Sequence, residues 1–169
     1  MATLKKLSKF QTVIAQIKNN NYEMALELLS KINSNLEEKH LENKLYGSIY
    51  FKKKEWLKSI EYFNRVLKMN EKDLVVLNNI GVALFNLGRF NEAIIFFKKL
   101  STHENNSINS LRSLGIAYKN IGEYKKAIEY FVKILNIRSN DDSIKQNLID
   151  IFNFYTPNKT ENNYLIELN

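Results

Sequence analysis

The stretch Leu77-Asn-Asn-Ile80-Gly81-Val-Ala-Leu84 returns 34 residues later as Leu111-Arg-Ser-Leu114-Gly115-Ile-Ala-Tyr118. In both copies the larger apolar residues and the glycine stand at i, i+3, i+4 and i+7, which is the spacing of one face of an α-helix. A glycine on such a face allows another backbone to approach closely. Self-similarity at a fixed period of this size is typical of repeat proteins, in which each unit buries its apolar face by stacking on its neighbours.

Four columns of similar residues follow the same period. The aromatic column consists of Tyr22, Trp56, Phe90 and Tyr124. The small-residue column, three places further on, consists of Ala25, Ser59, Ala93 and Ala127. The bulky column, four places after that, consists of Leu29, Phe63, Phe97 and Phe131. The glycine column consists of Gly47, Gly81 and Gly115, with Val13 in the equivalent place. We therefore expect each unit to be a helical hairpin with closely packed helices.

The turn of each hairpin is expected at a residue in the left-handed conformation. The residues at these places are Asn20, Lys54, Gly88 and Gly122. Glycine adopts that conformation at little steric cost and asparagine tolerates it, whereas lysine tolerates it less well.

These columns resemble the signature of the tetratricopeptide repeat family, in which Leu-Gly and an aromatic residue are followed by Ala and Phe at fixed offsets. The match is fullest in the third and fourth units. The resemblance implies an all-α fold, an α-α superhelix built as a right-handed solenoid of antiparallel helix pairs. One departure is systematic, because the proline expected near each unit's end is replaced. The residues in its place are Glu37, Glu71, Asn105 and Ser139.

The register also predicts the boundaries of an array that spans residues 1–155. The four repeats are placed at residues 6–39, 40–73, 74–107 and 108–141. A capping helix is expected at 142–155, with Leu148, Ile149 and Phe152 on its packing face, which brings the expected number of helices to nine. Pro157 cannot continue that helix. Residues 156–169 are expected to be a polar C-terminal tail, or a linker to a further segment. Their apolar residues are Tyr164, Leu165, Ile166 and Leu168.

The composition excludes several classes of protein. The chain has 169 residues, of which 44% are hydrophobic, and this is enough for one elongated domain. The absence of cysteine excludes disulfides and thiolate chemistry. The N-terminus lacks the apolar segment of a signal peptide, and no stretch is long enough to span a bilayer. We therefore expect a cytoplasmic protein without a membrane partner.

The net charge of +7 gives only weak support to nucleic-acid binding. The chain is rich in Lys, Asn and Ile together, as proteins of AT-rich genomes are. Its basic residues are spread out, and Lys52-Lys53-Lys54 is the one tight run. RNA binding is therefore kept as the weakest alternative.

No catalytic, metal or cofactor site is expected. His40 and His103 stand far apart near the unit junctions, and neither has a partner at ligand spacing. The stretch from Gly81 to Gly88 resembles a phosphate-binding loop only superficially, because no Lys-Ser/Thr follows it. The sequence thus predicts a protein that is not an enzyme.

In the tetratricopeptide repeat family, the first helices of successive units line a concave groove that takes an extended peptide or a partner helix. Register transfers this peptide-binding groove to polar and apolar side chains of the second, third and fourth units and of the capping helix. The predicted groove residues are Lys44, Ser48, Phe51, Lys52, Val75, Asn78, Asn79, Val82, Phe85, Asn86, Asn109, Arg112, Ser113, Ile116, Lys119 and Asn147.

The chemistry of these residues favours a protein or peptide partner. An Asn side chain offers both a donor and an acceptor, so it can pair with a peptide group. The cations Lys44, Lys52, Arg112 and Lys119 would favour acidic groups in the partner, and the apolar side chains would bury apolar ones. The sequence therefore predicts a protein–protein interaction scaffold. The alternative is the N-terminal substrate-recruiting domain of a larger transferase-type enzyme.

One break in the repeat pattern suggests a second contact. Three units carry Glu27, Glu61 and Glu129 at one position, where the third unit has Ile95. The register places Ile95 away from the packing stripe, so we expect it to be at least partly exposed. With Phe96 it would support weak self-association, or docking of the C-terminal tail.

Overall fold

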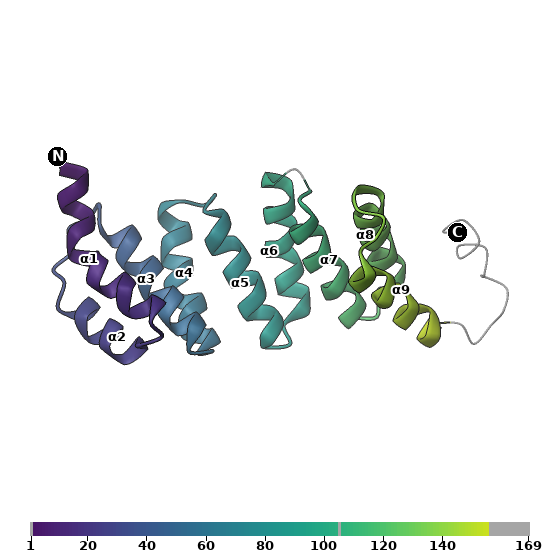
Figure 1. Ribbon diagram of the computed structural model, residues 1–169, viewed down its shortest axis with the longest axis horizontal. Coiled ribbons are helices and arrows are strands. Elements are labelled where there is room, and N and C mark those ends of the chain that lie inside the picture. Colours follow the sequence, from purple (N-terminus) through teal and green to yellow (C-terminus); the bar gives the residue numbers. More distant parts are fainter. Residues whose placement is uncertain (1, 105, 156–169) are drawn as a thin grey trace. The chain divides into compact units, whose positions relative to one another are not determined.

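The structure is a computed structural model that describes residues 2–104 and 106–155. Within these residues every element is a helix, and no strand occurs (Figure 1). The predicted all-α fold of paired helices is confirmed. The helices are α1 (Ala2–Lys18), α2 (Tyr22–Ser30), α3 (Lys39–Lys52), α4 (Trp56–Met69), α5 (Leu74–Asn86), α6 (Phe90–His103), α7 (Ile108–Asn120), α8 (Tyr124–Ile137) and α9 (Asp142–Tyr155).

The chain divides into two compact units, Met1–His103 and Glu104–Asn169. In the first unit the hairpins are α1 with α2, α3 with α4, and α5 with α6. Successive hairpins are joined there by contacts of α2 with α3 and of α4 with α5, and α3 also touches α5. In the second unit α7 pairs with α8, and α9 packs on α8.

The second, third and fourth hairpins are each held together where a glycine of the first helix meets an aromatic ring of the second helix. A Cβ atom added at Gly47, Gly81 or Gly115 would lie 2.5 Å from a ring carbon. The rings belong to Phe63, Phe97 and Phe131 of the bulky column. The hydroxyl of the small-column residue Ser59 also donates a hydrogen bond of 2.9 Å to the carbonyl oxygen of Gly47.

In the first hairpin, side chains of different volume fill the equivalent contact between the two helices. Val13 replaces the glycine and Leu29 replaces the phenylalanine, and both side chains are buried in one cluster with Phe10 and Ala25. A larger residue on the first helix is therefore matched by a smaller one on the second, as close packing requires.

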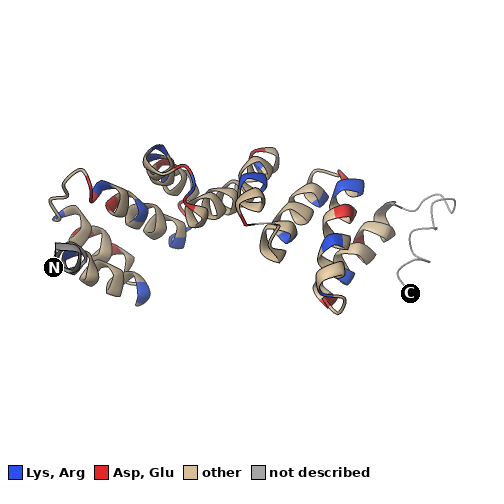
Figure 2. Ribbon diagram, turned by 90° about the horizontal axis from the view of Figure 1, so that it is seen from above, with Lys and Arg blue, Asp and Glu red and all other residues tan. Residues whose placement is uncertain are grey.

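Charged residues are unevenly distributed among the helices (Figure 2). On α4 they form exposed pairs within the helix, such as Arg65 with Glu61 at 2.6 Å. Exposed pairs of this kind contribute little to stability. In contrast, α5 carries no charged residue along its whole length.

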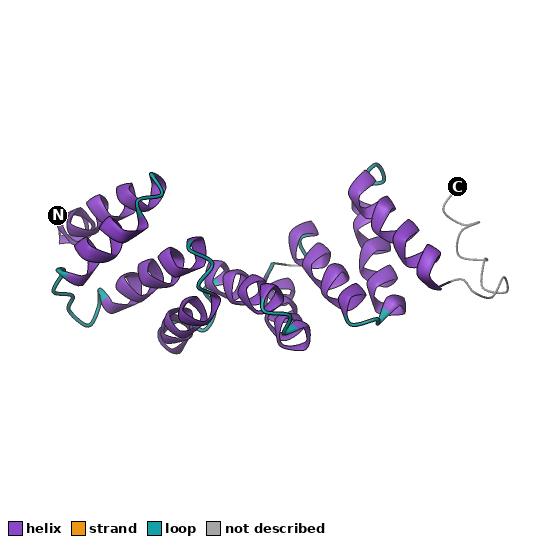
Figure 3. Ribbon diagram, turned by 90° about the horizontal axis from the view of Figure 1, so that it is seen from below, coloured by secondary structure: helices purple, strands orange, loops and turns teal. Residues whose placement is uncertain are grey.

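The turns inside the hairpins, drawn as short loops in Figure 3, follow the sequence prediction. Asn20, Lys54, Gly88 and Gly122 all have positive φ angles, between 60° and 77°. Lys54 adopts this conformation although its side chain makes it costly. Ion pairs from the preceding Lys53 to Glu23 at 2.7 Å and to Glu55 at 2.9 Å help to hold this turn.

The capping helix α9 departs from the sequence prediction in the residues that it buries. Leu148 is buried as expected, but the other buried side chains are Ile144 and Ile151. Phe152 is half-buried, and Ile149 is 48% exposed. Ile149 stands in the glycine column, whose residues are covered by a second helix in each hairpin. No second helix follows α9 within residues 106–155, so its side chain is open. The predicted tail, residues 156–169, lies outside the described residues.

Candidate functional site

The predicted groove residues divide between the two units. In the first unit, α3 carries Lys44, Ser48, Phe51 and Lys52, and α5 carries Val75, Asn78, Asn79, Val82, Phe85 and Asn86. In the second unit, α7 carries Asn109, Arg112, Ser113, Ile116 and Lys119, and α9 carries Asn147. The helices α3, α5 and α7 are the first helices of the second, third and fourth repeats, as the register predicts, and α9 is the capping helix.

Lys44 on α3 is held in an ion pair with the residue that caps α5. Its Nζ donates to Oδ2 of Asp73 at 2.7 Å. The other carboxylate oxygen of Asp73 accepts a hydrogen bond of 3.1 Å from the backbone N–H of Val76, which satisfies one of the open donors at the start of α5. The charge of Lys44 is thus neutralised within the protein.

Asp73 is itself adapted to this role. Burial raises the pKa of its carboxyl group, but the hydrogen bonds from Lys44 and from the N–H of Val76 outweigh that effect. The net result is a pKa of Asp73 below its ordinary value. The side chain is therefore ionised at neutral pH, as a cap and an ion-pair partner must be.

The second unit repeats this arrangement. Arg112 on α7 contacts Oδ2 of Asp141 at 2.6 Å, and Oδ1 of Asp141 accepts from the N–H of Ile144 at the start of α9. Lys119 lies between Oδ2 of Asp150 at 2.8 Å and Oδ1 of Asn147 at 3.0 Å. Both cations of α7 are therefore paired with carboxylates of α9 and its cap.

The remaining surface of α5 is uncharged and carries two side-chain amides without a hydrogen bond in the part of the chain that the structure describes. The side chains of Asn78 and Asn79 are half-buried and make no hydrogen bond with any described residue. Val75 is 57% exposed, and Val82 is partly exposed. Asn86 donates its amide to the carbonyl of Val82 at 2.8 Å.

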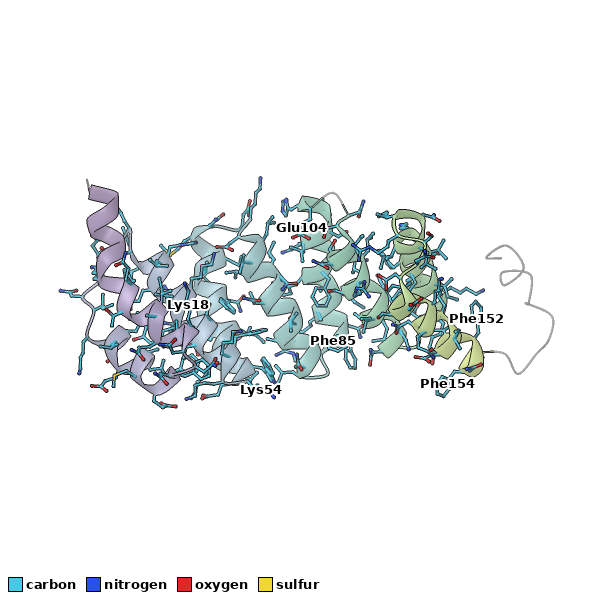
Figure 4. The ribbon with its side chains drawn as sticks, viewed as in Figure 1. Lys18, Lys54, Phe85, Glu104, Phe152 and Phe154 are labelled. Atoms are coloured by element: carbon cyan, nitrogen blue, oxygen red, sulfur yellow. The ribbon has the colours of Figure 1, made fainter. Side chains whose placement is uncertain are left out.

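The predicted groove phenylalanines are supported by the aromatic column. Phe51 meets Trp56 edge-on with ring centroids 5.3 Å apart, and Phe85 meets Phe90 in the same way at 5.0 Å. Figure 4 shows Phe85 near the end of α5. Both rings remain partly exposed, so each keeps some surface that a partner could cover.

Sequence profiles of the tetratricopeptide repeat match residues 45–73, 74–102 and 110–145, which together make up more than half of the chain. The chain belongs to the tetratricopeptide repeat family. This confirms the resemblance that the repeated columns indicated.

Solved structures of MamA have the same fold as this tetratricopeptide repeat protein. MamA from Desulfovibrio magneticus RS-1, from residue 41 to its end, has a TM-score of 0.81 at 15% identity, covering 97% of this chain and 93% of that one. MamA AMB-1 has a TM-score of 0.75 at 18% identity, with coverages of 90% and 83%. MamA MSR-1 has 0.66 at 27% identity, with coverages of 75% and 74%. These likenesses establish the fold alone. No curated protein sequence matches the chain significantly.

Sequence reasoning missed the ion pairs that join the first helix of a repeat to a carboxylate at the end of the same repeat, although their spacing was a usable signal. Lys9 with Glu38, Lys44 with Asp73, and Arg112 with Asp141 are each separated by 29 residues. The register placed four cations in the groove as available to a ligand. Three of them, Lys44, Arg112 and Lys119, are held in ion pairs within the protein. The fourth, Lys52, is exposed at the end of α3.

The histidines of the repeats do not form a metal site within the described residues. His40 lies in the first turn of α3, with Nε2 3.7 Å from Oδ2 of Asp73 and without a hydrogen-bond partner. His103 is exposed at the end of α6. No cluster of three or more potential metal ligands occurs in residues 2–104 and 106–155. In the same residues, every helix is too short or too polar to cross a membrane.

Ile95 on α6 is 54% exposed, as expected, whereas Phe96 is partly buried with the ammonium group of Lys99 over its ring. Self-association through these residues stays a prediction. An Ile95→Glu variant restores the glutamate of the other repeats and should keep the stability of the fold within about 0.5 kcal/mol. Sedimentation of both chains at high concentration checks the contact: equal molecular weights for the variant and the wild type would dismiss it.

Proposed function

We propose that this tetratricopeptide repeat protein is an interaction scaffold that holds an extended segment of a partner protein on α3 and α5. Family membership supports a protein partner. The observation that carries the proposal is the pair Asn78 and Asn79, whose amide groups are unengaged among the described residues beside the exposed side chain of Val75.

The spacing along α5 suits recognition of an extended chain. Val75, Asn79, Val82 and Asn86 stand at i, i+4, i+7 and i+11, so they share one face of the helix. A carboxamide can donate to a peptide carbonyl and accept from a peptide N–H at the same time. Apolar residues above and below would bury apolar side chains of the partner.

The surface is also preorganised, which lowers the entropy cost of binding. The start of α5 is fixed by the Asp73 cap, and its middle is fixed by the contact of Gly81 with Phe97. Phe51 and Phe85 are each braced by a ring of the aromatic column.

The proposal predicts that Asn78 and Asn79 matter for binding and hardly for stability. Peptides are first selected on the wild-type chain from a random peptide library, and their affinities are then measured by fluorescence anisotropy. An Asn78→Ala/Asn79→Ala variant should bind the selected peptides about tenfold to a hundredfold more weakly, because two hydrogen bonds to the peptide are lost. Its free energy of unfolding should change by less than about 0.5 kcal/mol.

The matched control is Asn64→Ala, which removes an exposed carboxamide from the second helix of the second repeat. It should leave peptide affinity unchanged. If the double variant folds and still binds every selected peptide with wild-type affinity, the site on α3 and α5 is wrong.

A further inference from the structure

Two cations of the first helices are already held in ion pairs with the residue that caps the next first helix, so they are not free to bind a ligand. Lys44 and Arg112 occupy the same place in the second and fourth repeats, and each grips a carboxylate that also caps the following first helix. Moving either cation toward a ligand would leave a buried, ionised cap without its partner. These two residues are therefore poorly suited to bind an acidic peptide.

The third repeat has neither the cation nor the aspartate of this ion pair. At the place of Lys44 and Arg112 it has Asn78, and 29 residues further on it has Ser107, which caps α7 by accepting from the N–H of Ser110. Neither Asn78 nor Ser107 is ionisable. The two unengaged amides of α5 thus lie in a repeat that carries no charge at this position.

The absence of charge extends over the whole of α5. From Leu74 to Asn86 the helix has no Asp, Glu, Lys or Arg, while its surface exposes Val75 and parts of Val82 and Phe85. A charged side chain placed against this surface would lose water without gaining a partner, which is costly. An apolar side chain placed there would gain by burial.

We infer that the partner segment lying on α5 is an extended, uncharged peptide with apolar side chains, and that the acidic partner suggested by the repeat register is not its ligand. This inference rests on the proposed function and specifies its ligand. Recognition then comes from hydrogen bonds of Asn78 and Asn79 to the peptide backbone and from burial of apolar groups.

The test uses the peptides selected from the random library on the full chain. Their dissociation constants are measured in about 50 mM and about 500 mM NaCl, a range over which exposed charge pairs are strongly screened. We expect changes of less than about twofold for the wild-type chain. The bound peptides should lack Asp and Glu in the segment whose binding depends on Asn78 and Asn79.

An Asn78→Lys variant serves as the matched gain-of-charge control. It places a cation at the repeat position of Lys44 and Arg112, in a repeat whose residue 29 places further on is Ser107 and not an aspartate. It should bind peptides with an added Glu more tightly than the wild type does, and this gain should disappear at high salt.

The outcomes separate the two proposals. If the selected peptides bind the Asn78→Ala/Asn79→Ala variant with wild-type affinity, the proposed function is wrong, whatever the salt dependence of binding. Peptides that depend on these two residues but are acidic, or that weaken about tenfold or more at high salt, overturn the inference about the ligand and leave the site in place.

Discussion

A Gly115→Leu variant should lose about 3 kcal/mol or more of its free energy of unfolding. A Cβ atom at this position would lie 2.5 Å from Cε1 and 2.8 Å from Cδ1 of Phe131. Phe131 is fully buried, so its ring cannot move into solvent to make room. The helices α7 and α8 must then separate, which exposes part of the hairpin's core. Urea unfolding followed by circular dichroism measures the loss.

The first hairpin provides the design for a control, because Val13 and Leu29 fill the same place with exchanged volumes. A Gly115→Val/Phe131→Leu variant should recover about 1 kcal/mol or more relative to Gly115→Val alone, since the two residues are in contact and their effects are not additive. A Gly115→Leu chain that unfolds at the wild-type urea concentration would contradict the packing described for the hairpins.

An Asp73→Ala variant is expected to lose about 2 kcal/mol of stability. The substitution removes the cap of α5, which alone contributes about 1 kcal/mol, and it leaves Lys44 half-buried without a carboxylate. Glu71→Ala is the control, since Glu71 is exposed two residues earlier and should change stability by less than about 0.5 kcal/mol. Equal urea midpoints for Asp73→Ala and Glu71→Ala would exclude the proposed role of the ion pair.

The same ion pair predicts a dependence of stability on pH. The pKa of Asp73 is below its ordinary value of 3.8 in the folded protein. Its contribution is therefore fully present above about pH 5, and it is lost as the pH falls below about 4 and through the folded-state pKa. Asp141, with Arg112 and the N–H of Ile144 as partners, also has a lowered pKa and acts in the same direction. The stability difference between the wild type and Asp73→Ala should shrink on acidification from pH 6 to pH 3.

The fold was accessible from sequence because its determinants recur. Gly81 and Gly115, with Phe97 and Phe131 always 16 residues later, define a helix contact that must be close in every repeat. A residue that fits poorly, such as Lys54 in a left-handed turn, could be placed correctly because its three counterparts fixed the register.

The site was less accessible, because it depends on contacts of each first helix with the residue that caps the next first helix. The register identified Lys44 and Arg112 as surface cations, but it did not show that Asp73 and Asp141 approach them from the start of the next first helix. The buried face of α9 was misassigned for a related reason. Whether Ile149 is covered depends on a following helix, which no pattern within α9 can reveal.

We propose that a partner segment lies on α3 and α5, the first helices of the second and third repeats. The most direct measurement is the change in backbone amide chemical shifts when a selected peptide is added to isotopically labelled full-length chain. Residues of α3 and α5, above all Asn78, Asn79 and Val82, should show the largest shifts in the first unit. Shifts confined to α4 and α6, with α3 and α5 unchanged, would contradict the account.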